Sequence, residues 1–151
     1  LRDDIETIHA ATDLLAEAKL SPELRNEALY YRAKAYTKQK ADKKAVDDLR
    51  ELAKDTRNAY GAEAKYLVAQ SLYDAKEYNA AEKELLNYIE QSTPHAYWLA
   101  RSFVLLSDVY AAMGKDLDAR QYLLSLQQNY QGNDDIATMI ESRLSKLKVK
   151  N

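Results

Sequence analysis

The sequence contains no cysteine and very little glycine or proline. Of its 151 residues, three are glycine, two are proline and none is cysteine. The lack of cysteine excludes disulfides, thiolate nucleophiles and zinc sites with thiolate ligands, and it is compatible with the cytosol or with an oxidising compartment. Because residues that break helices or form turns are so scarce, we expect long helices rather than sheets.

The sequence also lacks a long hydrophobic run and a strong excess of charge of either sign. No apolar stretch approaches the roughly 18 residues of a transmembrane helix, so we predict no membrane span. The net charge is −2, with 22 basic and 24 acidic residues. This mixed balance argues against a dedicated nucleic-acid-binding domain, which is usually strongly basic. Six basic residues do crowd one stretch, and they predict either a site for an anionic partner or a solvated helix end, which we favour: Arg32, Lys34, Lys38, Lys40, Lys43 and Lys44.

Motifs that carry catalytic or metal chemistry are missing. The two histidines, His9 and His95, are far apart and belong to no metal-binding pair. No glycine-rich phosphate loop, nucleophile elbow or aspartate-rich metal loop occurs. The sequence therefore predicts no catalytic residue, no cofactor and no metal site, and we expect a protein that is not an enzyme.

Start and stop signals divide the chain into eight predicted helices. Ser21-Pro22 and Thr93-Pro94 each offer a side-chain oxygen at a helix start followed by proline at the first helical position, and Thr56 and Asn133 are further candidate caps. Gly114 suits a left-handed position after a helix. The predicted helices span residues 4–19, 22–40, 42–55, 58–75, 78–91, 94–113, 116–129 and 134–148. Their short connections predict antiparallel neighbours.

One spacing of small, aromatic and bulky residues occurs three times, with intervals of three, nine, four and three residues. A small residue and an aromatic or leucine on one helix are followed by alanine and two bulky residues on the next. The three sets are Ala33, Tyr36, Ala45, Leu49 and Leu52; Ala69, Leu72, Ala81, Leu85 and Tyr88; and Ser107, Tyr110, Ala119, Leu123 and Leu126. Such a repeat predicts stacked helical hairpins with close backbone approach at the small residues.

At these positions the chain resembles tetratricopeptide repeat (TPR) proteins, with the best match from Ala62 to Leu85. The repeats are 36 and 38 residues long, measured from Ala45 to Ala81 and from Ala81 to Ala119, against about 34 in the family. The usual tryptophan position holds Leu29, Lys65 and Phe103. The longer first helices resemble those of bacterial envelope TPR proteins, such as outer-membrane assembly lipoproteins and Tol-Pal-associated coordinators.

The resemblance implies one all-α domain over residues 1–151, a right-handed superhelix of stacked antiparallel hairpins. Residues 1–20 would form a leading half-repeat, 22–55, 58–91 and 94–129 three repeats, and 134–148 a capping helix. Thr7, Ala10 or Ala11 could each take the small position in the first helix. Because the chain opens on Leu1, inside a helix-like pattern, we expect a fragment of a longer protein.

In the family, ligands lie in a concave groove lined by the first helix of each repeat. Carried over by position, the groove residues would be Glu27, Tyr30, Lys34, Thr37, Lys38, Glu63, Tyr66, Gln70, Tyr73, Asp74, Arg101, Val104, Asp108 and Ala111. Of these we single out Tyr30, Lys34, Lys38, Tyr66, Gln70, Tyr73, Arg101 and Asp108 as candidate binding residues. The tyrosines would either anchor a ligand or pack between repeats, and both readings stay open. Tyr97 and Trp98 would either cover the preceding hairpin or present an exposed aromatic edge.

The expected function is therefore that of a non-enzymatic scaffold that binds a protein or peptide segment in the groove. The alternative is an architectural or self-assembling segment of a larger helical-repeat protein, able to form a homo-oligomer through its first helix. The resemblance points towards the bacterial periplasm or outer membrane, and it leaves the identity of the partner open.

Overall fold

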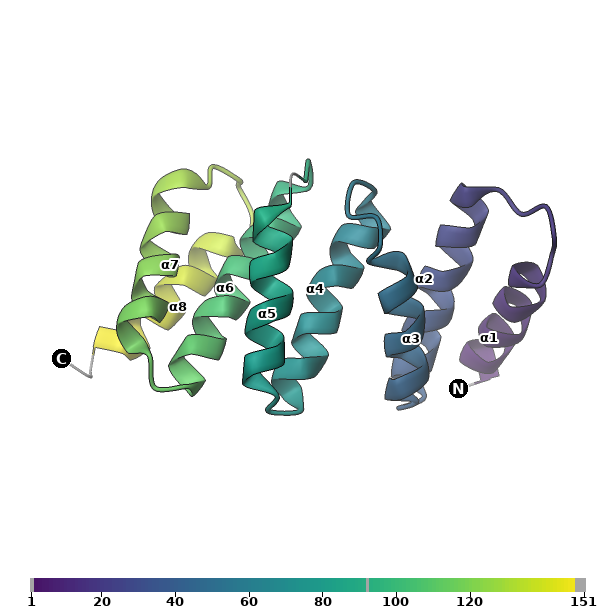
Figure 1. Ribbon diagram of the computed structural model, residues 1–151, viewed down its shortest axis with the longest axis horizontal. Coiled ribbons are helices and arrows are strands. Elements are labelled where there is room, and N and C mark those ends of the chain that lie inside the picture. The colour runs from purple at the N-terminus through teal and green to yellow at the C-terminus, as the bar shows by residue number, and fades with distance from the viewer. Residues whose placement is uncertain (1, 92, 149–151) are drawn as a thin grey trace. The chain divides into compact units, whose positions relative to one another are not determined.

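The computed structural model describes residues 2–91 and 93–148, and the regular structure in these ranges is entirely α-helical (Figure 1). The predicted all-α fold with eight helices is confirmed for this part of the chain. The helices are α1 (Arg2–Leu15), α2 (Pro22–Lys38), α3 (Asp42–Leu52), α4 (Ala59–Asp74), α5 (Tyr78–Glu90), α6 (Ala96–Ala112), α7 (Asp116–Asn129) and α8 (Ile136–Lys148).

A side chain caps some of the helix starts, although not always the residue predicted, whereas α3, α5, α6 and α7 begin without a side-chain cap hydrogen bond. Ser21 accepts a hydrogen bond from the Leu24 amide at 3.2 Å, as expected, with Pro22 at the first position of α2. The prediction that Thr56 caps α4 was wrong, because the Asn58 side chain accepts from the Gly61 amide at 2.8 Å.

Two later starts also differ from the prediction. α8 is capped by Asp134 rather than Asn133, since the Asp134 carboxylate accepts from the Ile136 amide at 3.0 Å. α6 begins at Ala96, so Pro94 precedes the helix instead of opening it. The Thr93 hydroxyl accepts from the His95 amide at 3.3 Å, which forms a turn ahead of the helix.

Three equivalent turns close the three predicted hairpins. Lys40, Lys76 and Gly114 each occupy the left-handed region, with φ of 59°, 62° and 76°, and each lies seven residues after the small residue of its repeat. The next amide donates back to the first helix in each case, from residue 41 to Tyr36, from 77 to Leu72 and from 115 to Tyr110, at 2.9, 2.9 and 2.8 Å. The predicted cap at Gly114 is confirmed, and the repetition extends from sequence to backbone geometry.

Most of the repeated positions are buried, and Tyr36 and Leu72 are half-buried. The small residues of the repeat are buried without exception, which permits the close approach that the spacing predicted. They are Ala33, Ala45, Ala69, Ala81, Ser107 and Ala119, and the bulky residues that follow on the second helices are buried as well: Leu49, Leu52, Leu85, Tyr88, Leu123 and Leu126. Of the three candidates for the small position in α1, Ala11 is buried, Ala10 is exposed and Thr7 is half-buried.

The chain divides into two compact units, Leu1–Val68 and Ala69–Asn151, and the division falls within α4. In the first unit α2 packs between α1 and α3. In the second, α6 packs against α5 and α7, and α8 packs against both α6 and α7. None of the described helices is long and apolar enough to cross a membrane.

A clamp of polar side chains joins α1, α2 and α3 in the first unit. The Arg32 guanidinium donates to both carboxylate oxygens of Asp48, at 2.7 and 2.8 Å, and to the Thr12 hydroxyl at 3.1 Å. Asp48 is buried, and the hydrogen bond to Asp48 outweighs desolvation and raises the pKa of Arg32. The clamp therefore fixes α2 against α1 and α3 with a charged pair that water barely reaches.

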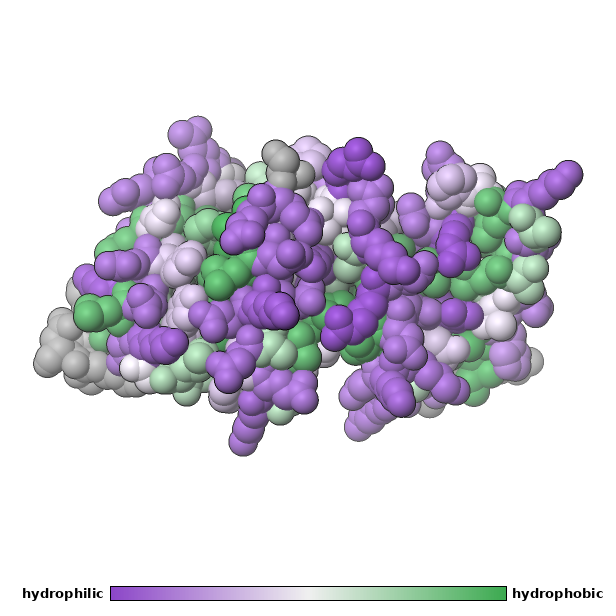
Figure 2. All heavy atoms as spheres, viewed as in Figure 1, coloured by the Kyte–Doolittle hydropathy of each residue, from purple (hydrophilic) through white to green (hydrophobic). Residues whose placement is uncertain are grey.

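Figure 2 shows hydrophilic residues over much of one face of the molecule, with hydrophobic residues reaching the surface near α1 and α2.

Candidate functional site

In the first unit, two predicted groove residues of α2 meet the beginning of α4. The Tyr30 hydroxyl donates to the Glu63 carboxylate at 3.0 Å, and the Lys34 ammonium lies 2.9 Å from the same carboxylate. Lys34 also sits over the Tyr30 ring, 5.2 Å from its centroid. The Glu63 carboxylate, the Tyr30 ring and the Lys34 ammonium thus form one connected group. Glu63 lies 33 residues after Tyr30 and 29 residues after Lys34 in the chain.

The contacts within this group favour a neutral Tyr30 phenol and a charged Lys34 ammonium. Partial burial and then the negative charge of Glu63 raise the pKa of Tyr30, so the phenol stays neutral and donates. Desolvation is the largest single effect and lowers the pKa of Lys34, but the hydrogen bond to Glu63, the charge of Glu63 and the contacts with Tyr30 together outweigh it, so the pKa of Lys34 is raised. Lys34 is therefore charged, and with 42% of its side chain exposed it keeps N–H groups available to an acceptor from outside.

Three tyrosine rings surround this group and form what we call the tyrosine cluster, Tyr30, Tyr31 and Tyr60. The Tyr30 centroid lies 4.7 Å from that of Tyr60 and 5.3 Å from that of Tyr31, the latter in an edge-to-face arrangement. Tyr31 is 51% exposed. Neither Tyr31 nor Tyr60 was predicted as a site residue from the sequence. A usable signal for Tyr60 existed, because Leu24, Tyr60 and Trp98 each lie nine residues before the small residue of their repeat.

The remaining predicted groove residues of the first unit differ in accessibility. Lys38 is exposed near the end of α2. Tyr66 is buried, with 6% of its surface exposed, so a ligand at the surface does not reach its ring without displacing other side chains. Of the six crowded basic residues, Arg32 pairs with Asp48 and Lys34 with Glu63. The stretch therefore offers less free positive charge than its sequence indicates.

In the second unit, Asp108 is paired and Tyr73 lies beside it. The Arg143 guanidinium of α8 donates to the two carboxylate oxygens of Asp108 at 3.1 and 3.2 Å. The Tyr73 ring packs 5.7 Å from that of Tyr78, and partial burial followed by the charge of Asp108 raises the pKa of Tyr73. Gln70 donates to Asp74 one turn further along α4, at 2.9 Å. Nothing in the sequence indicated that Arg143 would pair with Asp108.

Arg101 belongs to a separate aromatic group at the beginning of α6. Its guanidinium donates to the Tyr97 hydroxyl at 2.9 Å and lies 5.6 Å from the Trp98 ring centroid. The Tyr97 hydroxyl in turn donates to Asp135 at 3.0 Å. Tyr97 and Trp98 are both half-buried, so each ring is partly covered and partly exposed.

The ion pairs of the two units occupy equivalent repeat positions with opposite polarity. Lys34 and Asp108 each follow the small residue of their repeat by one position. Lys34 of α2 pairs with Glu63 of α4, and Asp108 of α6 pairs with Arg143 of α8, so each partner lies two helices further along the chain. Each unit thus carries a charged link at this position of the repeat, with the positive side chain on α2 in the first unit and the negative side chain on α6 in the second.

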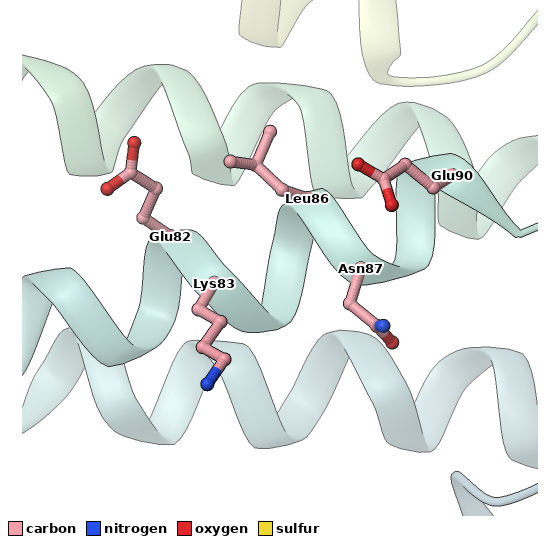
Figure 3. A pocket seen from close by; sticks show the side chains of 5 residues that line it. All are labelled: Glu82, Lys83, Leu86, Asn87 and Glu90. Atoms are coloured by element: carbon pink, nitrogen blue, oxygen red, sulfur yellow. The ribbon is translucent and has the colours of Figure 1, made fainter.

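A shallow recess of about 390 Å³ lies on the surface of α5, lined by Glu82, Lys83, Leu86, Asn87 and Glu90. Figure 3 shows Glu82, Leu86 and Glu90 pointing to one side of the helix, and Lys83 and Asn87 to the other. Side chains that diverge in this way do not converge on a ligand. Within residues 2–91 and 93–148, no group of three or more histidine, aspartate or glutamate side chains is arranged to hold a metal ion.

The tyrosine cluster with Lys34 and Glu63 therefore brings three aromatic rings and two oppositely charged side chains together in the first unit. Comparisons of the chain with protein-family models, curated proteins and solved structures gave no significant match.

Proposed function

We propose that the chain is a TPR-like helical repeat, a right-handed superhelix of stacked hairpins, which binds a protein or peptide segment in its concave groove without catalysing a reaction. Three equivalent turns at Lys40, Lys76 and Gly114 and the burial of the repeated small residues support a repeat architecture. A stack of rigid hairpins offers a preformed surface, so docking costs little ordering entropy in the scaffold.

The observation that carries the proposal is the tyrosine cluster beside Lys34 and Glu63. Tyrosine rings are among the side chains that dominate binding energy at interfaces, because they offer large apolar area with a polar tip. Tyr31 is half exposed and Tyr30 and Tyr60 are partly covered, so the three rings present a surface to which a segment can dock.

The same contacts specify which polar groups of a segment would be accepted. Glu63 already binds Lys34 at 2.9 Å, so a ligand carboxylate placed near Lys34 would also meet the negative charge of Glu63. A backbone carbonyl carries no full charge and can accept one of the remaining N–H groups of Lys34. We therefore expect Lys34 to orient the main chain of the segment rather than a terminal carboxylate.

The proposal is tested by affinity capture from cell fractions that include the envelope, followed by calorimetry with the captured protein in purified form. The binding variant is Tyr31→Ala with Lys34→Gln, which changes two accessible groups of the face. The matched control is Leu117→Ala with Lys83→Gln, on α7 and α5, because Leu117 is exposed and Lys83 lines the recess of α5. Tyr66 is left unchanged because it is buried.

We expect the binding variant to lose at least about tenfold in affinity, since hot-spot truncations cost about 2 kcal/mol or more, and the control to match the wild type. Equal loss in both variants, or none in either, contradicts binding at this face. Circular dichroism of each variant establishes that it is folded.

The alternative function, self-assembly, is favoured by one observation. Ile5 of α1 is a large apolar side chain that is 49% exposed, on the helix that would seal a dimer. Sedimentation over a range of concentrations distinguishes the two functions. A dimer that Ile5→Glu dissociates supports assembly through α1, whereas a monomer at all concentrations leaves segment binding as the better account.

A further inference from the structure

Glu27, Tyr31 and Tyr60 form an exposed arrangement of one carboxylate and two aromatic rings at the edge of the tyrosine cluster. Glu27 lies four residues before Tyr31 on α2, so the two share one face of the helix. Tyr60 belongs to the first turn of α4, and its ring centroid lies 4.7 Å from that of Tyr30, which itself lies 5.3 Å from that of Tyr31. Desolvation, followed by the charges of Tyr31 and Glu27, raises the pKa of Tyr60. Glu27 and Tyr31 are exposed and Tyr60 is half-buried.

The neighbouring group provides an internal comparison for this arrangement. There a carboxylate, Glu63, and a ring, Tyr30, hold the ammonium of Lys34 at 2.9 Å from the carboxylate and 5.2 Å from the ring centroid. The same kinds of group at Glu27, Tyr31 and Tyr60 hold no cation, because no basic side chain of the described residues pairs with Glu27. Two electron-rich rings and a carboxylate without a cation are complementary to a positive charge from outside the chain.

We propose that Glu27, Tyr31 and Tyr60 form a subsite for an arginine side chain of the bound segment. The guanidinium would stack on the rings and donate to the Glu27 carboxylate. Arginine fits better than lysine, since its planar guanidinium stacks on aromatic faces and forms two parallel hydrogen bonds with a carboxylate. A guanidinium is also more weakly hydrated than an ammonium group, so its desolvation costs less free energy. The inference rests on the proposed function, in which a protein segment docks on this face, and it adds the chemical class of one side chain of that segment.

A small probe tests the subsite without knowledge of the partner. The full chain, with its tyrosine rings labelled for NMR, is titrated with N-acetyl-arginine methylamide and with the citrulline analogue, which has nearly the same shape and no charge. We expect saturable shifts of the Tyr31 and Tyr60 ring signals with the arginine probe, in the millimolar range. The citrulline probe should bind about tenfold more weakly, because it loses the charge-assisted hydrogen bond and the cation–π contact.

Matched variants assign the effect to the subsite. Glu27→Gln should weaken the arginine probe about fivefold to tenfold, as expected for loss of a charge-assisted bond at an exposed site. Glu23→Gln, an exposed carboxylate one turn earlier on α2, should leave binding unchanged. Both substitutions are on the surface of a helix, and circular dichroism establishes that each variant is folded.

The inference is overturned if citrulline binds as tightly as arginine, if Glu27→Gln binds the probe like the wild type, or if the shifts fall only on tyrosines outside the subsite, such as Tyr97. These outcomes leave the proposed function standing when the captured partner still distinguishes the binding variant from its control. If instead the arginine probe binds at Glu27 while no partner distinguishes those variants, the subsite exists and the proposed function fails.

Discussion

The left-handed residue in each hairpin turn leads to a prediction in which two substitutions act in opposite directions. Lys76 and Gly114 occupy equivalent turns with φ of 62° and 76°, and both belong to the second unit. A side chain at Gly114 would meet no atom within 4 Å, so Gly114→Ala changes only backbone energetics. A left-handed conformation costs a non-glycine residue about 1–2 kcal/mol. Alanine also lowers the conformational entropy of the unfolded chain relative to glycine, which stabilises the folded state by about 0.4–1 kcal/mol.

The net effect is that Gly114→Ala should lower the free energy of unfolding by about 1 kcal/mol, and Lys76→Gly should raise it by a similar amount. In a chain of this length, each change corresponds to a shift of about 2–4 °C in the thermal midpoint. Circular dichroism during urea and thermal unfolding measures both. Lys76→Ala is the control, since it removes the lysine side chain and keeps the left-handed requirement, and it should be close to neutral.

If Lys76→Gly destabilised the protein, or if both substitutions had the same sign, the equivalence of the turns would be refuted. The turn geometry links the three hairpins more directly than burial does, because the same φ and the same hydrogen bond recur at each.

Three further perturbations follow from contacts described above. Asp48→Ala should cost about 3 kcal/mol in unfolding free energy, since it leaves the largely buried guanidinium of Arg32 unpaired, and urea denaturation measures it. Gly61→Ala should destabilise the protein by about 1–3 kcal/mol or more, because its Cβ would lie 2.8 Å from the Leu52 carbonyl oxygen with Asp55 closer still. Partial burial, followed by a hydrogen bond to a carboxylate, raises the pKa of Tyr130 to about 12. Its neutral form is thus stabilised by folding, and that contribution is complete below pH 10 and lost as pH rises towards about 12.

Matched measurements keep these predictions distinct from general fragility. Asp47→Ala removes an exposed carboxylate beside Asp48 and should cost less than about 0.5 kcal/mol; an equal loss would show that burial of the pair is unimportant. Ala59→Gly changes an exposed position in the turn of Gly61 and should cost at most about 1 kcal/mol. For Tyr130, absorbance of tyrosinate should lose a component titrating near pH 12 in Tyr130→Phe. Loss of a component near pH 10 instead would contradict the raised pKa.

The helices could be predicted from local sequence signals, because where a helix starts and stops depends mainly on residues close together in the chain. Ser21 and Pro22 fixed the start of α2, and the spacing of small residues identified positions that are buried. Errors arose where two polar residues close together in the chain were both able to cap a helix. Thr56 is buried, and the Asn58 side chain reaches the free amide of Gly61 instead.

Contacts between helices could not be predicted in the same way. Lys34 and Glu63 lie 29 residues apart and Asp108 and Arg143 lie 35 apart, so their pairing depends on how two helices face each other. The sequence indicated that Lys34 and Asp108 belong to one face, but it offered no means to know that each already has a partner of opposite charge. The burial of Tyr66 likewise depends on packing that hydrophobic spacing alone does not resolve.

The central claim, that a protein segment binds on the face formed by α2 and the beginning of α4, is tested most directly by mapping the captured segment onto the chain by NMR. The account predicts that the largest shifts and new intermolecular contacts fall on Tyr30, Tyr31, Lys34 and Tyr60. Shifts confined to α5 and α7, with these four residues unchanged, would contradict it.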